Sequence, residues 1–134
     1  MPAPTRLPGS QAKDVLALAG VFAASGVLHL ARPEVYEPLM PDLLPAHREI
    51  IFASGLAELA CAAGLLHPRT RRAAGWASAA LLVAVYPGNV KMAGDAARSR
   101  STRFKAVAFG RLPLQVPMVR TALKAARTSV PRPE

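Results

Sequence analysis

Aromatic residues and cysteines are scarce in this sequence. Only 5% of its 134 residues are aromatic, and Cys61 is its single cysteine. One cysteine excludes an intrachain disulfide and any site that needs a cysteine pair, so cysteine usage does not indicate a redox compartment. A lone cysteine in such surroundings is expected to be a small buried hydrophobic residue.

The short motifs of common catalytic sites are also missing. The sequence contains no GxGxxG, Walker, GxSxG or HExxH pattern. Its three histidines, His29, His47 and His67, are scattered along the chain, which argues against a metal site and against paired haem ligands. We therefore predict no metal and find no evident cofactor.

Acidic residues are few, with 8 Asp and Glu against 17 Lys and Arg and a formal net charge of +9. Excess positive charge is typical of proteins that bind nucleic acid or anionic lipid. The basic residues here lie between apolar runs rather than in one footprint. We therefore expect no nucleic-acid binding and predict membrane lipids as partners.

Long apolar runs are what the sequence has in abundance, since 51% of its residues are hydrophobic. Four runs lie at 15–31, 50–66, 73–90 and 106–123. Each has about the length of a helix that crosses a bilayer, roughly 17–25 residues. The helices of a soluble bundle, the alternative fold, would need polar faces that the first three runs lack. We therefore predict an all-α fold, a bundle of four transmembrane helices.

Small residues four positions apart within these runs would let helices approach closely. They are Gly20 and Ala24, Ala60 and Gly64, and Gly75 and Ala79.

The two ends of the chain are predicted to lie outside the bundle. Residues 1–13, with three prolines, are expected to form a disordered lead, residues 14–126 the membrane domain, and residues 127–134 a disordered basic tail. Arg6 and Lys13 before an apolar run are also typical of a signal peptide. Because three more runs follow, we interpret the first run as an uncleaved span.

The basic residues that flank the runs indicate an orientation. With four spans, both termini and the loop after the second run share one side. The lysines and arginines of that side are Arg6, Lys13, Arg69, Arg71, Arg72, Arg120, Lys124, Arg127 and Arg132. The other side carries fewer, and the cytoplasmic side usually carries more. We therefore predict a multi-pass protein of the cell membrane with cytoplasmic termini.

Five polar side chains interrupt the apolar runs: His29, Glu58, Asn89, Arg111 and Gln115. Consecutive spans are antiparallel, so all five fall in the same half of the membrane. Glu58 lies nearest the middle, where an isolated charge is costly, and we expect it to pair with Arg111. We predict that the five line a ligand-binding pocket.

Each of these residues also has a structural interpretation. Glu58 and Arg111 would then form a buried pair without function, Gln115 would join two helices, and His29 would lie at the interface. Pro87 and Gly88 indicate a turn or helix break, which Asn89 would cap.

Prolines mark two further features. Residues 32–48 contain four prolines, which disfavour a continuous helix and predict a proline-rich loop between the first two helices. The loop covers the half that holds the polar residues, and its apolar side chains would sink into the interface as a lid. Pro113 and Pro117 predict a kink in the fourth helix.

Several segments together resemble the DoxX-like family of small membrane proteins. They are SGVLHLARPEVYEPLMPDLLP, SGLAEL, GLLHPRTRRAAGW, YPGNVKMA and RLPLQ, within residues 15–118. The resemblance implies a four-helix membrane bundle. Some members of that family are subunits of membrane quinone-linked sulfur oxidoreductases, and no set of catalytic residues follows from the resemblance.

The residues and the resemblance predict a DoxX-like integral membrane protein with an intramembrane polar pocket, accessory to quinone-linked or other redox chemistry. Quinone is the candidate cofactor and a membrane oxidoreductase the candidate partner, because the chain alone shows no redox group. The alternative is a non-catalytic membrane interaction or structural subunit. A small-solute transporter is a third hypothesis, for which four helices are few unless the chain forms a homodimer.

Overall fold

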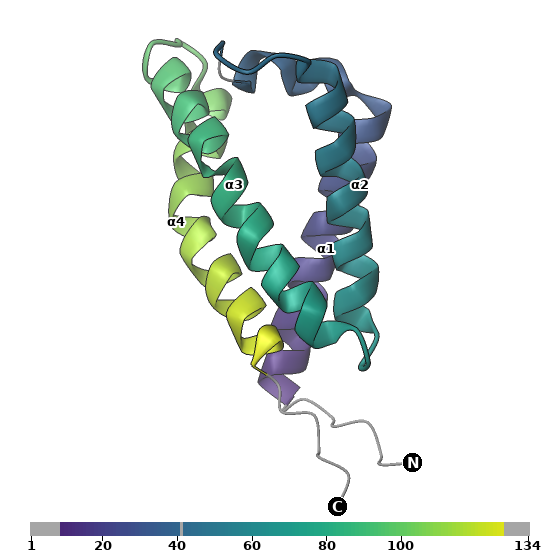
Figure 1. Cartoon of the computed structure of the whole chain (residues 1–134). Helices are drawn as coiled ribbons and strands as arrows, with labels where there is room; N and C mark the ends of the chain where they lie inside the picture. Colours follow the sequence, from purple (N-terminus) through teal and green to yellow (C-terminus); the bar gives the residue numbers. More distant parts are fainter. Residues whose placement is uncertain (1–8, 41, 128–134) are drawn as a thin grey trace, which may run out of the picture.

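The computed structural model describes residues 9–40 and 42–127, and these residues form an all-α chain (Figure 1). The helices are α1 (Gly9–Ala31), α2 (His47–Leu66), α3 (Arg71–Ala97) and α4 (Thr102–Ala126). Each runs antiparallel to the one before it, so α1 begins and α4 ends at the same end of the bundle (Figure 1). The predicted all-α class and the four helices are confirmed.

Three of the described helical segments are long and apolar enough to cross a membrane. They are Gln11–Ala31, His47–Leu66 and Arg71–Ala97. α4 does not reach this level, so three of the four predicted transmembrane helices meet it. The reason is its composition, since Arg111, Gln115 and Arg120 interrupt the run and further basic residues occupy both ends of the helix.

Two helix boundaries differ from the predictions. α1 begins at Gly9, so residues 9–13 of the predicted disordered lead are helical, while residues 1–8 and 128–134 lie outside the described residues. α3 continues through Pro87 and Gly88 to Ala97, so the predicted break there is wrong. A proline removes one backbone hydrogen bond, and the long helical segments on both sides are enough to carry the helix past it.

Prolines do not end α4 either. Pro113 and Pro117 lie inside one continuous helix, which is curved along its length (Figure 1). Its first turn is capped by Ser101, whose hydroxyl oxygen accepts a hydrogen bond of 3.2 Å from the Phe104 amide. α4 thus stays beside α3 from one end of the bundle to the other.

Neighbouring helices approach most closely at glycines. A Cβ atom on Gly26 of α1 would lie 2.8 Å from the carbonyl oxygen of Gly55 in α2, and one on Gly75 of α3 would lie 2.7 Å from the carbonyl oxygen of Ala122 in α4. Only glycine fits at such distances. By contrast, nothing lies within 4 Å of the corresponding position on Gly20, so that predicted close contact is absent.

The apolar core is concentrated in the half of the bundle that holds the termini. There all four helices contribute, with Phe22, Leu65, Leu82 and Ala122 among the buried residues. Toward the other end the α1–α2 pair and the α3–α4 pair diverge (Figure 1). The second apolar cluster, around Met92, joins only α3 and α4. The buried polar residues His29, Glu58 and Asn89 lie toward this end, beside buried apolar residues such as Ile51.

The segment between α1 and α2 lies over this diverging end. It forms two short 3-10 helices, η1 (Pro33–Val35) and η2 (Glu37–Leu39). η1 contacts α1 and α2, and η2 contacts α2 and α3. We call this end of the bundle the loop end and the opposite one the terminal end.

Candidate functional site

His29 of α1 and Glu58 of α2 form a buried pair near the loop end. His29 Nδ1 lies 3.3 Å from Glu58 Oε2, and the two residues are 8% and 7% exposed. Gly26 and Gly55, three positions earlier on the two helices, bring the backbones together on the same faces. A Cβ atom on Gly55 would lie 2.7 Å from the Cβ of His29. The pair therefore depends on the glycine contact.

The proton position on His29 follows from its neighbour one turn earlier. Nδ1 lies 2.6 Å from the carbonyl oxygen of Ser25, and 3.4 Å from the hydroxyl oxygen of the same residue. A carbonyl oxygen only accepts, so Nδ1 carries the hydrogen and donates it to Ser25. Glu58 Oε2 then forms no hydrogen bond to any described residue.

The loop is attached to the bundle at two points. The ring of Tyr36 stacks on His29, with centroids 3.7 Å apart and an angle of 19° between the planes. Lys91 Nζ of α3 donates to the carbonyl oxygen of Pro38 at 2.6 Å. These contacts hold the loop across the loop end, above the buried pair.

The outer surface of the loop is mostly charged. Arg32 Nε donates to Glu34 Oε1 at 2.5 Å, and this hydrogen bond lowers the pKa of Glu34. Arg48 lies 3.9 Å from Glu37. Leu43 is almost fully exposed among these charges. Val35 and Leu44 are also exposed. Charged groups beside exposed apolar side chains suit the headgroup region of a bilayer, and the lid function remains a prediction.

Arg111 does not pair with Glu58, which corrects the predicted ion pair. Its Nη1 lies 3.9 Å from Met92 Sδ, and no described carboxylate is within 4.0 Å of it. The reason is tertiary: α4 packs along α3, and this pair diverges from α1 and α2 toward the loop end (Figure 1). His29 on the adjacent α1 is the nearer partner. The charge of Arg111 still acts on Glu58 from a greater distance.

Asn89 lies on α3 in the same half of the bundle. It is buried, and its side chain forms no hydrogen bond to the described residues. Met92, three positions later, contacts Arg111. Asn89 and Arg111 thus provide hydrogen-bond donors on the α3–α4 side, while His29 and Glu58 occupy the α1–α2 side.

Gln115 belongs to helix packing rather than to this group. Its Nε2 donates to the carbonyl oxygen of Leu82 at 2.5 Å, and both residues are buried. Leu82 precedes Asn89 by about two turns of α3, roughly 10 Å of helix rise. The bond therefore joins α3 to α4 near the middle of the bundle, as the structural interpretation of Gln115 expects.

Replacing Gln115 by leucine should lower the free energy of unfolding by about 1 kcal/mol, because a hydrogen bond between helices is lost while the volume is kept. Unfolding in mixed micelles with increasing SDS measures the change. Thr121→Val is the control, since the Thr121 hydroxyl donates within α4, to Pro117. An equal cost for both variants would show that the Gln115 bond does not hold α3 and α4 together.

Three contributors to the site were not predicted: Ser25, Tyr36 and Met92. Ser25 precedes His29 by four positions, a spacing that places both on one helix face and was available as a signal. Tyr36 lies in an irregular segment, and Met92 contacts Arg111 across two helices. No local pattern indicates those two contacts.

A family model described as Domain of unknown function (DUF8561) matches residues 18–126. The chain belongs to this family. No curated protein and no solved structure matches it. The DUF8561 region extends from α1 to the end of α4 and contains all five predicted site residues, so the family description covers the whole bundle and names no activity.

Proposed function

We propose that this chain is a DoxX-like integral membrane protein in which all four helices lie within the bilayer. The support for α4 is its position beside α3. Gly75 packs against Ala122 at one end of the pair, and Met92 clusters with Ala108 at the other. A helix that follows a spanning helix over this length lies at the same depth.

The outward residues of α4 support the same proposal. Val107, Phe109, Leu114 and Val116 are about half exposed, whereas Gln115 is buried. Apolar side chains on the outside with a polar residue turned inward are the arrangement expected of a membrane helix. The termini then share one side, which we place in the cytoplasm.

We further propose that the polar residues of the loop end bind the head of a quinone. The observation that carries this is Glu58 Oε2, a buried carboxylate oxygen without a hydrogen-bond partner among the described residues, in the half of the bundle where His29 and Asn89 are also buried. Unsatisfied buried polar atoms are uncommon and costly in folded proteins. A ligand with its own hydrogen-bonding group removes the cost.

The chemistry of a quinone matches the two sides of the site. Its carbonyl oxygens accept hydrogen bonds, which Arg111 and Asn89 supply. A bound quinone would be converted to the hydroquinone by two electrons and two protons, and Glu58 would accept a hydrogen bond from the hydroxyl. Glu58 would hold or exchange a proton at this point. The electrons come from a membrane oxidoreductase partner, since the chain supplies no redox group of its own.

Quinone binding tests this proposal. The full chain is extracted in native lipid, its small molecules are identified by mass spectrometry, and a short-chain quinone is titrated into it. Arg111→Gln should weaken binding at least about tenfold, as expected for the loss of a charged hydrogen-bond donor. Arg103→Gln, at an exposed site on the same helix, should bind normally. A sample without quinone that also ignores added quinone would overturn the proposal.

The second candidate is a structural or interaction subunit, favoured by the bond from Gln115 to Leu82 and by the glycine contacts. The double variant His29→Phe with Glu58→Met separates the two functions. Phenylalanine keeps the stacking on Tyr36, and methionine keeps the volume of the glutamate. If the protein only packs helices, this variant retains its abundance and its partners. If the pair serves a ligand, quinone binding is lost from a folded protein.

A further inference from the structure

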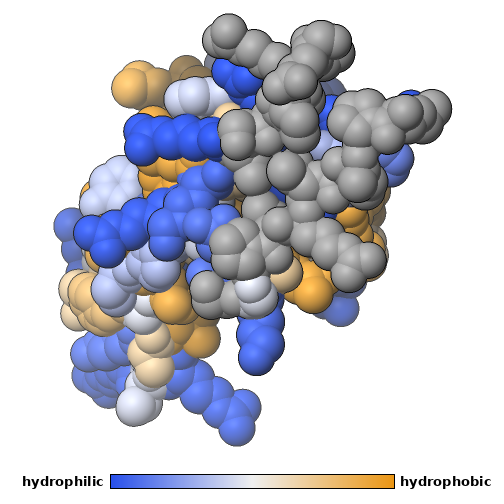
Figure 2. Space-filling model, turned by 90° about the horizontal axis from the view of Figure 1, so that it is seen from below, coloured by the Kyte–Doolittle hydropathy of each residue, from blue (hydrophilic) through white to orange (hydrophobic). Residues whose placement is uncertain are grey.

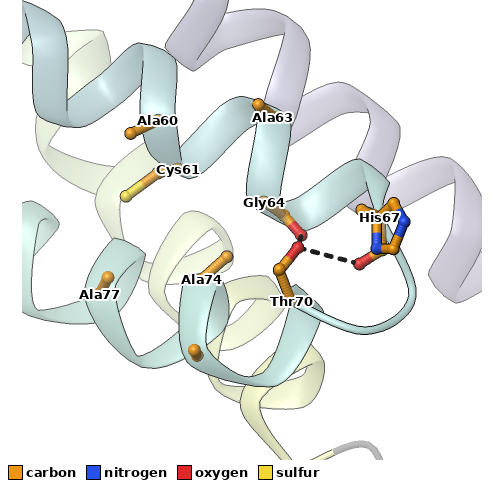
Figure 3. Close-up of a pocket in the computed structure, with 9 residues that line it drawn as sticks. Ala60, Cys61, Ala63, Gly64, His67, Thr70, Ala74 and Ala77 are labelled. Carbon is orange, nitrogen blue, oxygen red and sulfur yellow. Dashed lines mark hydrogen bonds between the residues drawn. The ribbon is translucent and has the colours of Figure 1, made fainter.

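A groove of about 600 Å³ lies between the end of α2 and the start of α3, at the terminal end and away from the polar site (Figure 3). Small side chains from both helices form its walls: Ala60, Ala63 and Gly64 of α2, with Ala73, Ala74 and Ala77 of α3. Its volume is in the range of pockets that hold small ligands, roughly 300–1,000 Å³.

Thr70 and His67 are the polar side chains that line the groove. The hydroxyl of Thr70 donates to the carbonyl oxygens of Gly64 at 2.8 Å and of His67 at 3.3 Å (Figure 3). The remaining lining residues are alanines, Gly64 and Cys61, so the surface of the groove is mostly apolar. Its floor is set by the close contact of Gly64 with Ala74.

In a bilayer an outward groove of this kind is filled by hydrocarbon. Ala60, Ala63 and Ala77 are exposed, so the groove opens on the outer surface of two helices that are apolar enough to span. Water finds no hydrogen-bond partners in an apolar recess, and an empty recess leaves its wall atoms without dispersion contacts. An acyl chain of a neighbouring lipid supplies those contacts.

The charges around the groove favour a lipid with an anionic headgroup. Basic residues occur at both ends of the bundle, but Asp14 is the single acidic residue at the terminal end of the described chain. The loop end has Glu34, Glu37, Asp42, Glu49 and Asp95. Hydrophilic side chains surround the terminal end (Figure 2). This end thus holds most of the positive potential, which attracts anionic headgroups.

Three arginines lie in the connection next to the groove. Arg69 follows His67 in the loop, and Arg71 and Arg72 begin α3. Arg71 donates to the carbonyl oxygen of Leu65 at 2.9 Å, which fixes the connection against α2. The cationic groups are thereby placed within one turn of the groove mouth.

We propose that this groove binds an anionic phospholipid, with an acyl chain between α2 and α3 and the phosphate at the arginines of the connection. A second copy of the chain fits less well, because its own basic connection would meet an identical one. This inference does not depend on the polar site or on quinone binding.

Trp76 provides a direct measurement. It is the single tryptophan, is 51% exposed, and precedes the groove residue Ala77 on α3. Lipids with brominated acyl chains quench tryptophan that they touch. The full-length protein is placed in vesicles that contain either brominated phosphatidylglycerol or brominated phosphatidylcholine at equal mole fraction. The anionic lipid should show a relative association constant at least about fivefold higher, as expected for arginines near an anionic headgroup.

Two matched pairs of variants test the groove and the charge separately. Ala77→Leu fills the groove and should abolish the preference, whereas Ala80→Leu, at an exposed site of α3 outside it, should retain the preference. The double change Arg69→Gln with Arg72→Gln should also abolish it. The double change Arg98→Gln with Arg100→Gln, at exposed sites of the loop end, should leave the preference unchanged.

Equal quenching by the two lipids in the unmodified protein would overturn the proposal. So would a preference that survives Ala77→Leu or the loss of Arg69 and Arg72. A dimer in lipid that Ala77→Leu dissociates, without any preference for the anionic lipid, would assign the groove to a second copy instead.

Discussion

Glu58→Gln should lower the free energy of unfolding by about 3 kcal/mol. Removing one member of a buried ion pair costs about 3–5 kcal/mol, because the remaining charge has no partner. We expect the lower end of this range, since glutamine keeps the size of the glutamate and one of its oxygen acceptors. Unfolding in mixed micelles with increasing SDS measures the loss.

Two variants make this expectation specific to the pair. Glu49→Gln changes an exposed glutamate in the first turn of the same helix and should cost less than about 0.5 kcal/mol. His29→Phe combined with Glu58→Met should regain most of the stability, because a buried pair replaced by apolar residues of similar volume is often neutral. Equal effects of Glu58→Gln and Glu49→Gln would contradict the buried pair.

Gly75→Ala should separate α3 from α4 and cost about 1–3 kcal/mol. A Cβ atom at this position would collide with the backbone nitrogen of Ala126 and lie 2.7 Å from the carbonyl oxygen of Ala122. Backbone atoms cannot rotate away as side chains do, so α4 must shift. The shift also removes the alignment of Gln115 with Leu82. The same unfolding experiment measures the change.

Gly94→Ala is the matched control on the same helix. Nothing lies within 4 Å of its added Cβ atom, and alanine is the better helix former by roughly 0.5–1 kcal/mol. This variant should therefore be neutral or slightly more stable. Gly75→Ala with the stability of Gly94→Ala would show that α3 and α4 are not in close contact at their terminal ends.

Much of the fold could be predicted because its causes are local. Long apolar runs form helices wherever they are buried in protein or lipid, and alternating direction follows from short connections. The placement of His29, Glu58, Asn89 and Arg111 in one half also follows from direction alone. α4 was the exception. Its charged residues lower its hydropathy, and only its packing along α3 explains why it belongs to the bundle.

Helix continuity at Pro87 was predicted wrongly for a related reason. A proline beside a glycine is typical of a turn, and the local preference favours a break. In the structure α3 extends well beyond both residues, to the contact of Met92 with Arg111 and of Lys91 with the loop. These tertiary contacts stabilise the second half of the helix, and no local pattern contains them.

The sequence by itself determined the number and direction of the helices, and which polar residues share the loop-end half of the bundle, because periodicity and chain order suffice for both. Only the tertiary structure decided the partners: His29 rather than Arg111 for Glu58, Leu82 for Gln115, Tyr36 above the buried pair. Partner choice depends on how closely two helices approach. Here glycine contacts bring α1 close to α2 and α3 close to α4. The two pairs of helices diverge toward the loop end, so Glu58 on one pair and Arg111 on the other are not partners.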